Sequence, residues 1–191
     1  MKLLAISGSA RSASTNTALL QVLADVSPKN VDITVFHKLQ TLPVFSPDLE
    51  GTNTPSEVKH FVDVIDQADG LIISSPEYVR AIPGGLKNAL DWLVSGEAII
   101  DKPVALIHGS HRGDDMLASL RLVLNTVTSA FHEQIFQRFP LISKSPEEVR
   151  DFLFQKENTE RLRSYIAEFS NTVLMSPKQQ HRRAENKLEN Y

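Results

Sequence analysis

Short apolar runs alternate with longer amphipathic stretches along most of the chain. Each run is about as long as a β-strand and contains mainly aliphatic or β-branched residues. Continuous apolar runs of this kind are typical of strands that are buried on both faces, as in a parallel sheet. A fifth, less regular strand region is predicted within Gln134–Ser143. The four clearer strand predictions are Lys2–Gly8, Asp32–His37, Gly70–Ser75 and Pro103–Gly109.

Helical periodicity fills the segments between these runs. Apolar residues recur three or four positions apart, which places them on one face of a helix. Ser56 is a candidate N-cap, and Ser145 followed by Pro146 and two acidic residues is a helix start signal. The predicted helices are Asn16–Val26, one after Ser56, one from near Pro83 to Leu93, Asp114–Phe131, and one from Pro146 to about Ser170.

The repeated alternation of strands and helices predicts βαβ units and therefore a parallel sheet with helices on both faces. Five strands in one domain favour an α/β, flavodoxin-like, doubly wound sheet, which forms a three-layer sandwich. We expect a single domain over residues 1–175. The polar segment 176–191 has mixed charge, and we expect it to be a C-terminal tail or a frayed helix.

Composition narrows the possible functions. The chain has 191 residues, a formal net charge of −3 and no cysteine. The small net charge gives no strong basic field for nucleic acid, and the lack of cysteine excludes disulfides and thiol redox chemistry. Redox chemistry would therefore need a bound cofactor. No stretch has the apolar length of a membrane span, so we expect no membrane partner and a cytoplasmic location.

The first predicted strand leads into a loop, Ser7–Asn16, that is rich in Ser, Thr, Gly and Asn. The loop contains Arg11 but neither a Walker A lysine nor a G-x-G-x-x-G sequence. Backbone amides at a helix N-terminus and a guanidinium together favour an anion, so the loop is a candidate phosphate site. A Ser-rich capped turn explains the same composition equally well. Ligands of doubly wound sheets bind beyond the carboxyl ends of the strands, where two further loops are expected.

The second loop follows the third strand and carries Glu77, Tyr78 and Arg80 close together. The sequence Pro83–Gly85 suits a helix start and permits close approach of the backbone to a ligand or another chain. Two less specific readings remain open. Glu77 and Arg80 could form an exposed ion pair, and Tyr78 could cover the edge of the sheet.

The third loop, His108–Asp115, follows the fourth strand. Its His and Asp residues match no strong metal-binding spacing, so we predict no metal site. Gly109 and Gly113 instead suit a loop whose backbone approaches a flat ligand. Ser110 lies outside the G-x-S-x-G frame of a nucleophilic serine.

Three motifs resemble those of the NAD(P)H-dependent FMN reductase family. The first is G-S-x-R-x(2)-S-x-N in the first loop, which resembles the family's FMN phosphate loop. The second is L-P-V-F-S-P-D-L-E at Leu42–Glu50. The third and longest is S-P-E-Y-V-R-A-I-P-G-G-L-K-N-A-L-D-W-L at Ser75–Leu93, which resembles the family signature. The motifs occur in the family's order within the first half of the chain.

The resemblance implies a flavodoxin-like fold, bound FMN, and hydride transfer from NADPH or NADH through flavin N5 to a quinone, free flavin or similar small acceptor. It implies no catalytic side chain, because flavin N5 carries the chemistry, and it implies a homodimer or homotetramer. By position, it assigns the FMN phosphate to Ser9, Arg11, Ser14, Thr15 and Asn16. It assigns the borders of the flavin ring to Pro76, Glu77, Tyr78 and Val79 and to Gly109, Ser110 and His111.

Two positions depart from the family pattern. Val79 stands where the family often has Asn, and Ala81 where it often has Ser. The backbone amides are unaffected by both changes, so we expect flavin binding to be kept. Any side-chain hydrogen bond from these two positions is lost, and with it a contribution to the flavin potential and the acceptor preference.

Other functions use the same residues. A flavodoxin-type electron carrier and a flavin-sensing binding protein without turnover both remain alternatives. The net charge of −3 counts against a carrier, because such carriers are usually strongly acidic. A phosphate-ester hydrolase is disfavoured, because the first loop contains no Cys, Asp or Glu as nucleophile or acid.

Overall fold

A five-stranded parallel sheet with strand order β2-β1-β3-β4-β5 lies at the centre of the molecule. The computed structural model describes residues 1–176; of the predicted tail, 177–191 lie outside the described residues. The strand order is that of the flavodoxin-like doubly wound fold, so the predicted fold class is confirmed. The strands are β1 (Lys2–Ser7), β2 (Asp32–Phe36), β3 (Gly70–Ser74), β4 (Val104–His108) and β5 (Phe131–Arg138).

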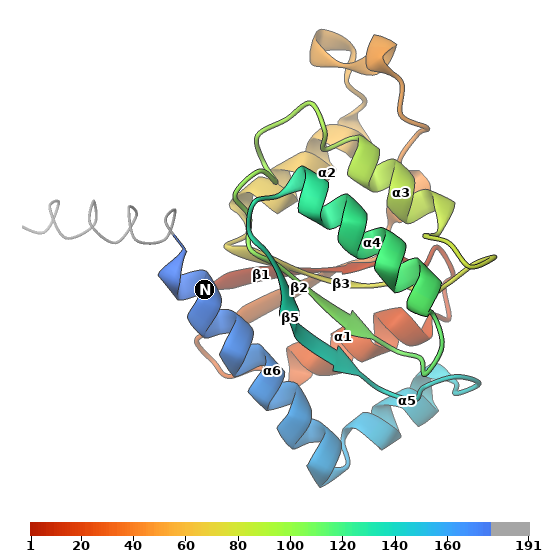
Figure 1. Cartoon of the computed structure of the whole chain (residues 1–191), viewed down its shortest axis with the longest axis vertical. Coiled ribbons are helices and arrows are strands. Elements are labelled where there is room, and N and C mark those ends of the chain that lie inside the picture. Colours follow the sequence, from red (N-terminus) through yellow and green to blue (C-terminus); the bar gives the residue numbers. More distant parts are fainter. Residues whose placement is uncertain (177–191) are drawn as a thin grey trace, which may run out of the picture.

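Six α-helices of the described chain cover the sheet in two layers (Figure 1). Helices α1 (Thr15–Asp25), α5 (Pro146–Leu153) and α6 (Lys156–Met175) pack on one face and share one buried apolar core. Helices α2 (Ser56–Gln67), α3 (Gly84–Asp91) and α4 (Asp114–Val127) pack on the other face around a second core. None of these helices has both the length and the apolar character that a membrane crossing requires.

The central strands explain the continuous apolar runs of the sequence. All five residues of β3 and all five of β4 are buried, because each strand has a neighbour on both sides and helices on both faces. The edge strand β5 is less buried, and its register with β4 shifts between Val104 and Leu106. All four strand pairings of the sheet are parallel, so the carboxyl ends of the strands meet at one edge.

The boundary between α4 and β5 differs from the prediction. We predicted a helix to Phe131, but α4 ends at Val127 and Phe131 is the first residue of β5. Phe131 lies four positions after Val127, so it fits helical periodicity as well as a strand. Thr128 ends the helix with extended backbone, and its hydroxyl donates to the carbonyl of Lys102 at 2.9 Å. This contact between distant segments could not be seen in the local pattern.

The prediction of one continuous C-terminal helix is also wrong. It divides into α5 and α6, and Gln155 has extended backbone between them. Side chains of α6 satisfy the free carbonyls at the end of α5: Asn158 Nδ2 donates to Phe152 O at 2.8 Å. Thr159 Oγ1 donates to Leu153 O at 2.9 Å. The predicted start is correct, because Ser145 and Glu148 form a reciprocal capping box.

Two other helix starts shift by one residue. Pro55 occupies the N-cap position of α2, and Ser56 is the first helical residue rather than the cap. Likewise Pro83 occupies the N-cap position of α3, and Gly84 begins the helix.

Helix α3 and the preceding Leu42–Glu50 segment bind each other through two residues of the signature motif. Asn88 Nδ2 donates to Pro43 O at 2.9 Å, and Asn88 Oδ1 accepts from Phe45 N at 2.8 Å. The indole of Trp92 is buried and donates to the same Pro43 carbonyl at 2.8 Å. These two side chains therefore fix the second motif against the third, which gives both motifs a packing role.

Candidate functional site

The loops after β1 and β3 touch at the carboxyl edge of the sheet, on the right of Figure 1. Gly8 N donates to Ser74 O at 2.7 Å. A Cβ atom added to Gly8 would lie 2.7 Å from Ser75 Oγ, which is closer than real Cβ atoms come. Gly8 is therefore required by the chain's own packing, because only glycine lets the two loops approach this closely.

A pocket of about 370 Å³ opens between four loops at this edge. It contains residues from each of the three loops that sequence reasoning selected. Six of the twelve predicted site residues line it: Thr15, Asn16, Pro76, Glu77, Gly109 and Ser110. The other six lie on the same loops but outside the lining: Ser9, Arg11, Ser14, Tyr78, Val79 and His111.

The first loop ends at a capped helix N-terminus. Ser14 has extended backbone at the N-cap position of α1, and its Oγ accepts from Thr17 N at 3.2 Å. The amides of Thr15 and Asn16 lie in the first turn, where a helix offers no intrahelical acceptor. Arg11 is exposed and forms no ion pair with the described residues. Free amides, a helix dipole and an uncompensated guanidinium together fit a phosphate group.

Asn16 also has a structural role that could not be predicted from the sequence. Its Oδ1 accepts a hydrogen bond from Ser74 Oγ at 2.8 Å, and both side chains are buried. At the next residue of α1, the Thr17 hydroxyl lies 2.8 Å from that of Ser7. These polar contacts anchor the start of α1 to β1 and β3. Asn16 Oδ1 is therefore occupied, and only its amide groups remain for a phosphate.

The second loop contains a tight hairpin at its tip. Tyr78 and Ala81 exchange backbone hydrogen bonds of 3.3 and 3.0 Å. The two residues between them, Val79 and Arg80, have φ values of 52° and 59°. Positive φ at both central residues is the requirement of a type I′ turn, which favours Asn and Gly. A β-branched residue in this conformation is strained, so Val79 is an unusual occupant of the tip.

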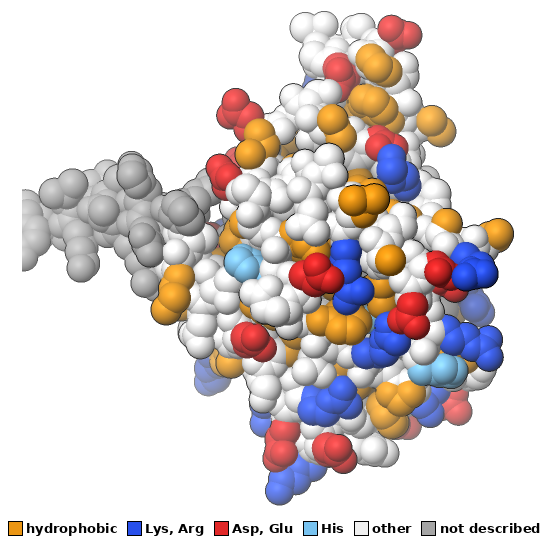
Figure 2. All heavy atoms as spheres, viewed as in Figure 1, with side chains coloured by type: hydrophobic (Ala, Val, Ile, Leu, Met, Phe, Trp, Pro, Cys, Tyr) orange, Lys and Arg blue, Asp and Glu red, His pale blue; other side chains and the backbone are white. Residues whose placement is uncertain are grey.

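Glu77 and Arg80 do not pair with each other; both contact the start of α4. Glu77 Oε2 accepts from Met116 N at 3.3 Å. Arg80 Nε lies 2.6 Å from Asp115 Oδ2, which raises the pKa of Arg80 through that hydrogen bond and the adjacent charge. The two contacts join the second loop to the third. Figure 2 shows acidic and basic side chains next to each other on this side of the molecule.

Gly84 and Gly85 have more free space around them than Gly8 has. A Cβ on Gly84 would meet no atom within 4 Å, and one on Gly85 would meet only Leu39 Cβ at 3.9 Å. The described chain therefore does not itself require glycine at these two positions. Close approach of a ligand or another chain here stays a prediction.

The third loop is tied to its own strand by His108, which sequence reasoning had weighed only as a metal ligand. The buried His108 ring contacts Arg112 O through Nε2 at 2.6 Å, and its Nδ1 is buried as well. Burial lowers the pKa of His108, and Arg138 lowers it further. Gly113 follows with φ 102°, and a Cβ there would lie 2.8 Å from His108 Nε2.

A fourth loop completes the pocket, and sequence reasoning missed it. Leu141, Ile142 and Ser143 belong to the lining of the pocket. We had placed this segment in the fifth strand, but β5 ends at Arg138. The signal that could have separated it is Pro140, because proline cannot donate to a sheet ladder. Ser75, His108, Arg112 and Gly113 also line the pocket and were not assigned to the site.

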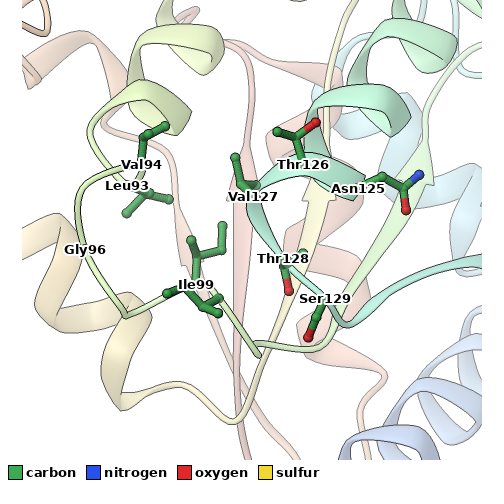
Figure 3. A pocket seen from close by; sticks show the side chains of 10 residues that line it. Leu93, Val94, Gly96, Ile99, Asn125, Thr126, Val127, Thr128 and Ser129 are labelled. Atoms are coloured by element: carbon green, nitrogen blue, oxygen red, sulfur yellow. The ribbon is translucent and has the colours of Figure 1, made fainter.

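Elsewhere in the described chain, neither a metal site nor a second pocket provides a stronger candidate site. No group of three or more His, Asp and Glu residues in the range 1–176 could hold a metal ion. A second pocket lies at the opposite edge of the sheet, before β4 and β5, and its ten lining residues include no charged side chain (Figure 3). The pocket at the carboxyl edge, which includes charged side chains, is therefore the stronger candidate site.

Comparisons with known proteins identify the family of the chain. Residues 1–136 match the family described as NADPH-dependent FMN reductase. The NADH:(hydroxy)cinnamate reductase subunit CrdA of Vibrio ruber is 38% identical over 112 residues, which are 58% of this chain and 54% of that protein. The quinone reductase of Escherichia coli K12 is 32% identical over 116 residues, 59% of this chain and 61% of that protein.

The alignments therefore span less than two thirds of the length of these two curated relatives. A solved structure extends the similarity in fold to nearly the whole chain. The flavoenzyme NAD(P)H:(acceptor) oxidoreductase FerB of Paracoccus denitrificans has a TM-score of 0.72 and 23% identity, covering 90% of this chain and 98% of its own. The family match covers well over half of the sequence, and the chain belongs to the NADPH-dependent FMN reductase family.

Proposed function

We propose that the protein is an FMN-dependent oxidoreductase that takes two electrons from NADPH or NADH and passes them to a quinone, free flavin or similar small acceptor. For a quinone, the balanced reaction is NAD(P)H + H⁺ + quinone → NAD(P)⁺ + hydroquinone. The observation that carries the proposal is the convergence of the loops after β1, β3 and β4, of which the first two carry family motifs, on one pocket beside the N-terminus of α1. The family membership of the chain supports the same activity.

The cofactor site would use backbone groups more than side chains. Arg11, the hydroxyls of Ser9 and Ser14 and the first-turn amides of Thr15 and Asn16 would hold the phosphate of FMN. Pro76, Glu77, Tyr78 and Val79 would border the flavin ring on one side. Gly109, Ser110 and His111 would border the other.

When bound, FMN supplies the hydride chemistry, because its ring accepts and donates electron pairs that no protein side chain can carry. The protein's part is to orient the ring and to present backbone N–H groups where negative charge develops on reduction. Glu77 and His108 contribute indirectly by fixing the second and third loops. No side-chain acid or base is needed for hydride transfer itself.

An absorbance spectrum of the purified protein tests the cofactor, and steady-state oxidation of NADH and NADPH with a quinone tests the activity. We expect a yellow protein and oxidation that depends on added quinone. A colourless protein that fails to bind FMN at about micromolar concentration would contradict the proposal, since about 8 kcal/mol of binding energy corresponds to that affinity. Tight FMN binding without NAD(P)H oxidation would support the electron-carrier or flavin-sensing alternative.

We further propose that the protein acts as a homodimer or homotetramer in the cytoplasm. Support comes from the tip of the second loop, where Tyr78 is 51% and Val79 is 98% exposed. Apolar and aromatic side chains of this kind are common at subunit interfaces. Light scattering during size-exclusion chromatography tests the oligomeric state, and a strictly monomeric species would contradict it. Cell fractionation tests the location.

A further inference from the structure

Three arginines surround the carboxyl edge of the sheet at the start of α4, and two of them are neutralised. Arg80 pairs with Asp115 at 2.6 Å, and Arg138 pairs with Asp114 at 2.5 Å. The third, Arg112, lines the pocket itself and forms no ion pair, side-chain hydrogen bond or cation–π contact with the described residues. Arg112 is exposed, so its guanidinium is an uncompensated positive charge on a residue of the pocket lining.

The backbone of Arg112 is held from both sides. Its N–H donates to Ser110 Oγ at 2.8 Å, and its carbonyl contacts His108 Nε2 at 2.6 Å. The next residue, Gly113, has a left-handed conformation and no room for a side chain beside His108. Because the peptide is already held, ligand binding would have to order only the rotamers of the Arg112 side chain.

No other charged group in the described lining of the pocket provides a permanent positive charge. Glu77 is the one carboxylate among the lining residues of the pocket, and Met116 N at the start of α4 already occupies one of its oxygens. Burial lowers the pKa of His108, which favours a neutral ring. Arg11 stands on the first loop and is not part of the lining. Arg112 is thus the permanent cation of the pocket wall among the described residues.

We propose that Arg112 is the binding residue for an anionic oxygen group on one of the two substrates, either the carboxylate or sulfonate of an acidic electron acceptor or the 2′-phosphate of NADPH. This inference rests on the proposed oxidoreductase function. A guanidinium is charged at any working pH, and its planar fork matches two oxygens of such a group. Two sources share this chemistry: an acidic electron acceptor and the 2′-phosphate of NADPH.

Equilibrium binding tests the inference without turnover. FMN-loaded wild type, Arg112→Gln, Arg112→Lys and Arg163→Gln are titrated with benzenesulfonate, NADP⁺ and NAD⁺ while the flavin absorbance or calorimetric heat is recorded. Arg163 is an exposed residue of α6 that is absent from the pocket, so its variant controls for loss of one charge. We expect Arg112→Gln to raise the Kd of an anionic probe about tenfold relative to NAD⁺, and Arg112→Lys to raise it less.

Kinetics then identify the source. A larger rise in KM for a sulfonated benzoquinone than for 1,4-benzoquinone assigns Arg112 to the acceptor, whereas a larger rise for NADPH than for NADH assigns it to the nucleotide. Equal changes for partners with and without the sulfonate or the 2′-phosphate, loss of FMN from Arg112→Gln, or the same effect in Arg163→Gln would overturn the inference. A wild type that binds the probes but oxidises neither NADH nor NADPH would contradict the proposed function and leave the binding result standing.

Discussion

The carboxylate of Glu77 accepts a hydrogen bond from the backbone amide of Met116 at 3.3 Å. Helix α4 has Gly113 at its N-cap position and no side-chain cap of its own. Glu77, which lies 39 residues earlier on another loop, supplies the acceptor and a negative charge near the positive end of the helix. One residue of the pocket wall therefore also joins two of the loops that form the pocket.

Replacement of Glu77 by Ala is expected to lower the free energy of unfolding by about 1 kcal/mol, the usual effect of removing a helix cap. Glu77→Gln should lower it less, because an amide oxygen still accepts from Met116 N and only the charge–dipole attraction is lost. Urea unfolding at pH 7 measures both. Glu97→Ala, at an exposed loop position, is the control and should change stability by less than about 0.5 kcal/mol. A Glu77→Ala variant as stable as this control would show that the contact contributes nothing.

The left-handed backbone of Val79 predicts that this residue lowers stability. Val79→Asn and Val79→Gly should each raise the free energy of unfolding by about 1 kcal/mol, because both residues tolerate φ 52° better than a β-branched one. Thermal and urea unfolding provide the measurement. Val44→Asn is a matched control, since Val44 is also exposed but is not among the residues with positive φ. A gain at Val44 equal to that at Val79 would attribute the effect to surface polarity instead of backbone strain.

Buried His108 gives stability a dependence on pH. Burial lowers the pKa of His108 below 6.5, and Arg138 acts in the same direction, while hydrogen bonds with the backbone of Arg112 and of Ser75 and the charge of Asp114 act against it. The unfolded chain therefore binds more protons than the folded chain between the two pKa values. The stabilising contribution is complete above about pH 6.5 and is lost as the pH falls through the folded pKa.

Urea unfolding at intervals from pH 5 to pH 8 should accordingly show lower stability at the acidic end. His108→Gln should flatten this slope. Burial also lowers the pKa of His132, so His132→Gln is the necessary comparison. It should remove only the part of the pH dependence of stability that His132 itself causes. If His108→Gln keeps the full slope of the wild type, other groups cause the acid sensitivity.

The sequence predicted more of the fold than of the side-chain contacts at the site. Buried strands such as β3 and β4 were visible because their apolar runs are a local property. The C-terminal end of α4 and the start of the fifth strand could not be predicted from the local pattern. They depend on the hydrogen bond between Thr128 and Lys102, which are far apart in sequence. The same reason explains why Glu77 was not seen as a cap for α4. Arg112 was missed because an unpaired side chain is recognised only after its neighbours are placed.

The exposed guanidinium of Arg11 makes a separate prediction about the cofactor. Arg11→Ala should weaken FMN binding by about 1.5–3 kcal/mol, the range for a hydrogen bond to a charged group, with the lower end favoured by solvent exposure. Riboflavin lacks the phosphate, so its affinity should be the same in Arg11→Ala and wild type. Fluorescence titration of the apoprotein with each flavin measures the difference, and Arg163→Ala controls for net charge. An equal loss of affinity for both flavins would mean that Arg11 acts through the loop and not through the phosphate, whereas unchanged FMN affinity would remove Arg11 from the site.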